Sequence, residues 1–303
     1  MQDNPLVSII LPVYNGSRFL SESVESCLAQ SYKNWELIIV NDCSTDNSLA
    51  IAEGFAAKDD RIKVISNAVN SKIPATLNNG FALAQGELYT WTSHDNRFAP
   101  AFLEKFVDFF EKNPDVGFLA GAYEAIDEDG NVLYQVSLPD PQLMMPLINP
   151  VAYAFMYRAS VARQAGEYDK DFFLVEDYEY WIKLWLHTKT AKIDDCLYFT
   201  RDFKGTLTQS RKQDIARQLM RLRLKYFDVF DSKLQATPAL RYRFFISLID
   251  SAQGEEKRKL FAKLSKLSPK FAFKYSFIHK PLAWLKKQHW YWNLKKKIKK
   301  TEK

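Results

Sequence analysis

The first hundred residues alternate between short apolar runs and segments with helical spacing. Val7–Leu11 is a continuous apolar run, as expected of a strand that is covered on both faces. After it, Ser17 is a candidate helix N-cap, and apolar residues follow at helical spacing as far as Leu28. Further strands are expected at 37–40, 61–66 and 88–92, and further helices at 47–57, 75–84 and 101–112. This βαβ pattern predicts an α/β fold with a mostly parallel sheet flanked by helices.

The middle of the chain is less regular. Gly117–Ile126 and Val132–Val136 flank a turn at Asp129-Gly130 and predict a hairpin, and 151–157 is another candidate strand. Glu176–His187 has the pattern of a helix, and beyond residue 210 the pattern stays helical. We therefore expect a catalytic domain of residues 1–210 and a helical, basic and aromatic-rich extension of residues 211–303.

Three of the predicted strands end in unusually polar loops, which are Pro12–Ser17, Asn41–Asp46 and Ser93–Asn96. Parallel strands present their carboxyl ends at one edge of the sheet, where loop amides and helix N-termini bind ligands. Asp42 and Asp95 could therefore bind a nucleotide and its metal-bound diphosphate together in one crevice. Each aspartate is equally compatible with capping a helix or a turn.

Composition and charge narrow the class of protein. The chain is 47% hydrophobic and 26% charged, which excludes global disorder. The whole chain has a net charge of +6. Residues 255–303 carry 16 Lys and Arg against 3 Glu, a net charge of +13, so residues 1–254 have a net charge of −7. The basic character belongs to the tail, and we expect no nucleic-acid partner. The 3 cysteines form no CxxC pair, which fits a reducing compartment.

Both ends of the chain bear on its location. The apolar stretch near the N-terminus is too short for a signal peptide or a membrane span, which predicts a cytoplasmic protein. The tail from Phe271 to Lys300 interleaves aromatic residues with lysines, which is typical of a segment that binds a membrane surface. Packing of its aromatic residues on the catalytic domain and nucleic-acid binding are the alternatives. We expect peripheral contact with the inner face of the cytoplasmic membrane.

Three blocks of the sequence together resemble glycosyltransferase family 2. The blocks are Val7–Ser48, which contains LPVYNGS and IIVNDCSTDNS, then Asn70–Asn96, and then Val175–Leu184, which reads VEDYEYWIKL. The resemblance covers about residues 6–210. It implies a GT-A, Rossmann-like fold and transfer of a sugar from a nucleotide-diphosphate donor.

The resemblance also implies roles for the polar loops. Pro12, Val13, Tyr14 and Asn15 match the loop that wraps the base and ribose of the donor. Asp42 matches the acid that accepts a hydrogen bond from the base, usually uracil. Asp95 resembles the last aspartate of the metal-binding DxD motif, which implies Mn²⁺ or Mg²⁺ as cofactor.

The chain departs from the family pattern at the metal motif. Where the family commonly shows Asp-x-Asp-Asp, this chain has Ser93-His94-Asp95-Asn96, so a single carboxylate remains. We therefore expect weaker metal binding. His94 is a candidate metal ligand, a hydrogen-bond donor to the diphosphate, or a loop residue without such a role.

Two further departures concern positive charge. Leu77 stands where many members carry arginine, directly before Asn78, which is a candidate donor-binding residue. Phe203 replaces the usual histidine in the segment RDFKGTLT. Arg201 or Lys204 could then supply positive charge near the diphosphate.

Glu176 and Asp177 form a second candidate centre. Direct displacement at the anomeric carbon needs one general base, which takes the proton of the acceptor hydroxyl. Adjacent residues of a helix project about 100° apart, so only one of the pair can face the acceptor. By resemblance, Asp177 is the expected base and Glu176 the supporting or acceptor-binding residue. The alternative is an acidic first helical turn that is favoured by the macrodipole.

These observations predict an inverting glycosyltransferase. The donor would be a nucleotide-diphosphate sugar, with UDP preferred, and the acceptor a saccharide or lipid-linked saccharide in cell-envelope polysaccharide synthesis. The alternative is a catalytically silent protein that binds sugar nucleotides or acts as a membrane-tethered scaffold. A nucleotidyltransferase is less favoured, because only Arg18 offers positive charge in the first loop.

Overall fold

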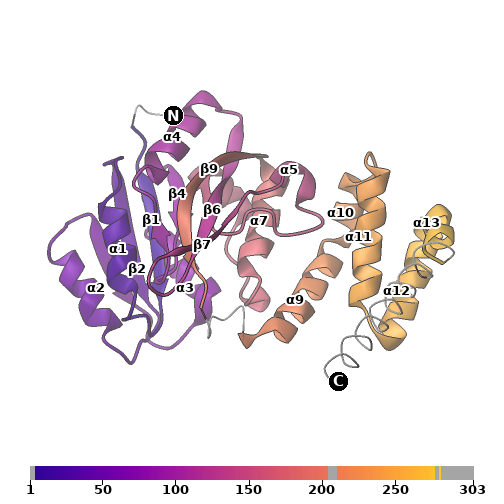
Figure 1. Ribbon diagram of the computed structural model, residues 1–303, viewed down its shortest axis with the longest axis horizontal. Coiled ribbons are helices and arrows are strands. Elements are labelled where there is room, and N and C mark those ends of the chain that lie inside the picture. The colour runs from indigo at the N-terminus through magenta and orange to yellow at the C-terminus, as the bar shows by residue number, and fades with distance from the viewer. Residues whose placement is uncertain (1–3, 204–209, 277–279, 281–303) are drawn as a thin grey trace, which may run out of the picture. The chain divides into compact units, whose positions relative to one another are not determined.

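The computed structural model describes residues 4–203, 210–276 and 280 (Figure 1). The chain divides into two compact units, residues 1–222 and 223–303. The division falls between residues 222 and 223, within helix α9 (Lys212–Lys225), whereas the predicted boundary is at 210/211. The assignment of a catalytic domain and an accessory extension stays a prediction.

A mixed sheet of nine strands forms the centre of the first unit. Its order is β3-β2-β1-β4-β8-β6-β9-β5, and β7 pairs with β6. The pairs β1·β2, β1·β4, β2·β3 and β6·β9 are parallel, whereas β8 is antiparallel to both of its neighbours. The strands are β1 (Val7–Val13), β2 (Trp35–Asn41), β3 (Ile62–Ser66), β4 (Leu88–Trp91), β5 (Arg97–Phe98), β6 (Val116–Ile126), β7 (Val132–Val136), β8 (Ala154–Arg158) and β9 (Lys189–Arg201).

Helices cover both faces of this sheet. They are α1 (Leu20–Leu28), α2 (Ser48–Ala56), α3 (Lys72–Phe81), α4 (Phe102–Lys112), α5 (Pro141–Met144), α6 (Ala159–Ala165) and α7 (Glu176–His187), with a 3-10 turn η1 at Lys170–Phe172. The bounds of α7 are those that the sequence predicts. The expected cap at Ser17 is wrong, because α1 starts at Leu20 and the Ser17 backbone N–H donates instead to Asp46 (3.0 Å).

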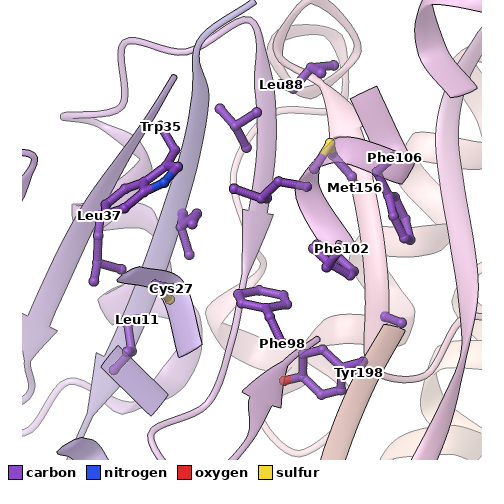
Figure 2. Close-up of a cluster of buried hydrophobic side chains, with 14 of the residues drawn as sticks. Leu11, Cys27, Trp35, Leu37, Leu88, Phe98, Phe102, Phe106, Met156 and Tyr198 are labelled. Carbon is purple, nitrogen blue, oxygen red and sulfur yellow. The ribbon is translucent and has the colours of Figure 1, made fainter. Parts of the chain in front are cut away.

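The core on one face packs β1 and β2 against α1 and α4. Figure 2 shows Leu11 and Leu37 from the strands, Cys27 from α1 and Phe102 and Phe106 from α4 within one cluster of buried side chains. Alternate residues of β1 point to the other face and are buried as well. Burial of both faces explains why the sequence of this strand is a continuous apolar run.

The opposite face is covered by α3 and α7. At Gly80 of α3 an added Cβ would lie 2.5 Å from Cγ2 of Ile10, so only glycine permits this close approach of helix and strand. From α7, the Trp181 ring packs on Phe155 and Phe118, with centroid distances of 4.3 and 5.1 Å. Helices thus support both faces of the strands that end in the polar loops.

The predicted hairpin is present as β6 and β7. The Asp127 carboxylate accepts hydrogen bonds from the backbone N–H groups of Asp129 (3.0 Å) and Asn131 (2.8 Å) and closes the turn. Gly130 adopts a φ of 88°, a left-handed conformation that favours glycine.

The second unit is helical, as its sequence pattern predicts. Its helices α10 (Phe227–Lys233), α11 (Pro238–Ser251), α12 (Gly254–Leu267) and α13 (Pro269–Lys274) enclose a core that includes Phe227, Phe244 and Phe271. Of the predicted membrane-binding tail, Phe273 is exposed and Tyr275 is buried, while 277–279 and 281–303 lie outside the described residues. No helix among the described residues has the length and apolar character needed to cross a bilayer.

Candidate active site

The ends of five strands define one edge of the sheet. β1, β2 and β4 are mutually parallel, and β6 and β9 share their direction because β8 is antiparallel to both β4 and β6. The carboxyl ends of these five strands therefore meet at the same edge. All three predicted polar loops leave from it, and β8 begins there.

The first two loops are joined by hydrogen bonds. The backbone N–H of Asn15 donates to Ser44 Oγ (3.0 Å), and Asn15 Oδ1 accepts from the backbone N–H of Thr45 (2.8 Å). Burial raises the pKa of Asp46, but hydrogen bonds from Ser48 and Ser17 outweigh it and hold the pKa at about 2. In the first loop Val13 is buried, Pro12 is partly buried and Tyr14 is exposed.

Asp42 is buried at the end of β2 and anchors the start of α3. Its Oδ1 accepts hydrogen bonds from Asn67 Nδ2 (2.8 Å) and the backbone N–H of Ser71 (2.7 Å), and its Oδ2 accepts from the backbone N–H of Lys72 (2.9 Å). A carboxylate offers about four acceptor positions, so one position on Oδ2 is left for a ligand. Asp42 thus has the capping function that was considered as an alternative, and its contact with a base stays a prediction.

The loop after β4 is packed against the first loop. Ser23 Oγ of α1 donates to the Ser93 carbonyl (2.9 Å). The His94 ring lies directly on Gly16, where an added Cβ would be 2.3 Å from His94 Cδ2. The Asp95 carboxylate is partly buried and has no hydrogen bond or ion pair within the described part of the chain. His94 thus fits the role of a loop residue, and Asp95 presents a carboxylate that a ligand can use.

The prediction that Arg201 binds the donor is not supported. Its side chain has no exposed surface. Its guanidinium donates to the backbone carbonyls of Asp95 (3.2 Å), Asp127 (2.9 Å) and Glu128 and to Glu22 Oε2 (2.8 Å). Arg201 therefore connects the Asp95 loop to the β6–β7 turn as a positioning residue. The other candidate cation, Lys204, lies outside the described residues.

Asn78 likewise holds backbone in place. Its Nδ2 donates to the Tyr168 carbonyl (3.0 Å), and its Oδ1 accepts from the Tyr168 backbone N–H (2.8 Å). This reciprocal pair fixes the segment before η1 on α3. One N–H of its amide remains without a partner among the described residues, and Asn78 is partly exposed, so its contact with the donor stays a prediction.

Glu176 and Asp177 start α7 in different surroundings. Glu176 is buried, and its Oε2 has no hydrogen-bond partner in the described part of the structure. Burial, and then the charge of Asp177, raise the pKa of Glu176. Burial also raises the pKa of Asp177, which remains partly exposed and accepts a hydrogen bond from Asn149 Nδ2 (2.8 Å). A partly exposed carboxylate with a raised pKa suits a general base.

Two tyrosines, Tyr198 and Tyr153, pack together beside the end of β4. Tyr198 of β9 shares a hydrogen bond with Thr92 (2.8 Å), and its ring stacks on Tyr153 with a centroid distance of 6.4 Å. Burial, then Tyr123 and then the charge of Asp177 raise the pKa of Tyr153 to about 12. Asn149, which binds Asp177, and Tyr153 belong to the same segment before β8, so this segment joins Asp177 to the side chains beside the Asp95 loop.

Asn149, Tyr153 and Tyr198 were not predicted as site residues from the sequence. Asn149 and Tyr153 precede β8 in an irregular segment, and only the pairing of β8 with β4 and β6 brings them to the site. No group of three or more His, Cys, Asp or Glu side chains placed to hold a metal occurs among the described residues. A metal here would need ligands from the donor as well as Asp95.

Comparisons with known proteins agree with this geometry. Residues 8–166 match the family model of glycosyl transferase family 2. The chain is 36% identical over 208 residues to the putative glycosyltransferase EpsE of Bacillus subtilis, covering 67% of this chain and 75% of that protein. It is 35% identical over 195 residues to the uncharacterized glycosyltransferase RC0461 of Rickettsia conorii, covering 59% of this chain and 31% of that protein.

Solved structures share the fold at low sequence identity. S. aureus TarS 1-349 in complex with UDP-GlcNAc superposes with a TM-score of 0.63 at 18% identity, over 89% of this chain and 87% of that one. The mannosyltransferase PcManGT from Pyrobaculum calidifontis, in complex with GDP-Man and Mn²⁺, has a TM-score of 0.62 at 14% identity, covering 88% of this chain and 76% of that one. The fold is thus the predicted GT-A fold, and this chain belongs to glycosyltransferase family 2 and is a glycosyltransferase.

Proposed function

We propose that the protein is an inverting glycosyltransferase that uses a nucleotide-diphosphate sugar, with UDP preferred. The observation that carries this proposal is that Asp95 follows β4, while Asp177 is hydrogen-bonded to Asn149, which precedes the neighbouring strand β8 at the same edge of the sheet. The first would face the donor diphosphate, and the second the acceptor. The complex of a structural neighbour with UDP-GlcNAc supports the donor class.

The reaction would be a single displacement at the anomeric carbon. The acceptor oxygen forms a bond to that carbon while the bond to the diphosphate oxygen breaks, and the nucleoside diphosphate leaves with the bonding electrons. Asp177 takes the proton of the acceptor hydroxyl, and the raised pKa strengthens it as a base. Glu176, buried beside it, would hold the first turn of α7 in place.

The residues fit a metal that is shared with the substrate. Mg²⁺ and similar ions are commonly held by one or two carboxylates together with substrate phosphates. Asp95 offers one carboxylate without a hydrogen bond among the described residues, which is the minimum for such a site. Mn²⁺ or Mg²⁺ held there would supply positive charge that stabilises the leaving diphosphate.

The acceptor would be a saccharide or lipid-linked saccharide in cell-envelope polysaccharide synthesis. Membrane contact through the basic, aromatic tail would bring the site to lipid-linked acceptors at the inner face of the cytoplasmic membrane. Among the described residues of the tail, the exposed Phe273 and Lys274 agree with this location, whereas Phe271 and Tyr275 are buried.

The test is release of nucleoside diphosphate from a panel of sugar nucleotides, with and without Mn²⁺. Asp177→Asn should lower turnover about 100-fold to 10,000-fold, the range of general-base catalysis, while UDP affinity stays unchanged. Asp171→Asn, in a side chain that is 76% exposed, is the matched control. Full turnover in Asp177→Asn would overturn the assignment. Nucleotide binding without release by the wild-type protein would favour the silent alternative.

A further inference from the structure

The junction of β7 and β8 leaves aromatic side chains exposed beside Asp177. Both strands pair with β6 at successive positions, since Gly121 pairs with Ala154 of β8 and Tyr123 with Val136 of β7. Between them the chain leaves the sheet over residues 137–153 and returns at Tyr153, which remains 38% exposed.

The Tyr153 ring is held in a fixed orientation. It stacks on Tyr198 with an interplanar angle of 5°, and Tyr123 meets it edge-on with a centroid distance of 5.0 Å. A ring that is supported on these sides binds a ligand without losing side-chain freedom.

The same segment is attached to the proposed base. Asn149 Oδ1 accepts hydrogen bonds from the backbone N–H groups of Val151 (3.2 Å) and Ala152 (3.4 Å), which turns its Nδ2 toward Asp177 Oδ2 (2.8 Å). This turn leads directly into Tyr153. A group that rests on the Tyr153 ring is therefore close to the carboxylate that takes the proton.

We propose that Tyr153 is an acceptor-binding residue, on which a sugar ring of the acceptor saccharide packs its C–H face. This inference rests on the proposed function and names the side of the site that the acceptor occupies. The choice of a saccharide follows from the surroundings, because a rigid aromatic face beside a general base suits a ring whose hydroxyl group is deprotonated. The polar Asn149 amide and the Asp177 carboxylate of the adjoining turn are less suited to a lipid chain.

Kinetics with the full chain test this assignment. Tyr153→Ala should raise the acceptor KM about tenfold, which corresponds to about 1.4 kcal/mol, while the affinity for UDP measured by titration calorimetry stays unchanged. Tyr153→Phe keeps the ring and should keep the acceptor KM. Leu133→Ala, at an exposed position of the edge strand β7, is the control and should leave the acceptor KM unchanged.

A binding measurement needs neither turnover nor the natural acceptor. With fluorotyrosine-labelled protein and UDP present, methyl glycosides of glucose, galactose and N-acetylglucosamine are titrated and followed by ¹⁹F NMR. Tyr153→Phe identifies the Tyr153 resonance, which should be the one that shifts. A shift at other tyrosines only, or an unchanged acceptor KM in Tyr153→Ala, would overturn the inference. Absence of turnover in the wild-type protein would instead contradict the proposed function.

Discussion

Replacing Arg201 with methionine should destabilise the first unit, because this residue acts from within the fold. The substitution keeps an apolar side chain at this position and removes the guanidinium, whose Cζ lies 4.1 Å from the Phe19 ring centroid. It leaves three backbone carbonyls without their donor, each hydrogen bond to a charged group being worth about 1.5 kcal/mol or more. The ion pair with the 43% exposed Glu22 adds little.

These losses together amount to about 4 kcal/mol, allowing for incomplete additivity. A loss of that size lowers the melting temperature of a unit of about 200 residues by about 8–16 °C. Differential scanning calorimetry measures the shift, and titration calorimetry with UDP measures the nucleotide affinity of the folded variant. We expect the melting temperature to fall and the UDP affinity to stay within about threefold of the wild-type value.

Arg18→Met is the matched control for stability. Arg18 also packs on Phe19, with its guanidinium 4.6 Å from the ring centroid, but its side chain is 61% exposed and pairs with Glu128 on the surface. Loss of such an exposed pair should change stability by less than about 1 kcal/mol. An unchanged melting temperature for Arg201→Met, together with lost UDP binding, would refute the positioning role and restore the predicted diphosphate contact.

Two further predictions concern the acidic pair and the tail. The folded state raises the pKa of Glu176, so it holds a proton that the unfolded chain releases, and stability should fall as the pH rises from about 4.3 toward the raised pKa. In urea titrations, Glu176→Gln should make the fall in the free energy of unfolding shallower by up to about 1.4 kcal/mol per pH unit. The exposed control Glu53→Gln should keep the wild-type slope, and a wild-type slope for Glu176→Gln as well would refute this prediction. Truncation after Ser276 removes nine lysines, each worth about 1 kcal/mol at an anionic surface, and should abolish sedimentation with phosphatidylglycerol vesicles but not change the behaviour with phosphatidylcholine vesicles. Equal sedimentation of both chains would place the contact elsewhere.

The sequence was informative where the signal is local. The continuous apolar run of β1 predicts a strand that is buried on both faces, and the spacing of α7 predicts its bounds at Glu176 and His187. Polar residues after the strands predict the edge that carries Asp42 and Asp95. These features are determined by residues that are close to one another along the chain, so they can be recognised in a single sequence.

The contacts of individual side chains could not be predicted in this way. The positions of Arg201 and Asn78 in the motifs indicate that both lie near the site. Only the pairing of β9 with β6, and the packing of α3 on the segment before η1, show that N–H groups of both side chains donate to backbone carbonyls. Tyr153 and Asn149 reach the site through residues 137–153, whose path depends on the antiparallel insertion of β8. Such contacts between residues far apart in the sequence have no periodic signature.

The placement of charge also decides which arginine can reach a donor diphosphate. Arg201 is buried, and moving it outward would break three carbonyl contacts that hold the Asp95 loop. Arg18 starts from an exposed pair with Glu128 that contributes at most about 1 kcal/mol, so its release costs little. A diphosphate beside Asp95 would place negative charge next to a carboxylate, and that repulsion needs a cation close to both groups. A divalent ion would meet this need directly, and of these two arginines only Arg18 has an exposed side chain that could supplement it.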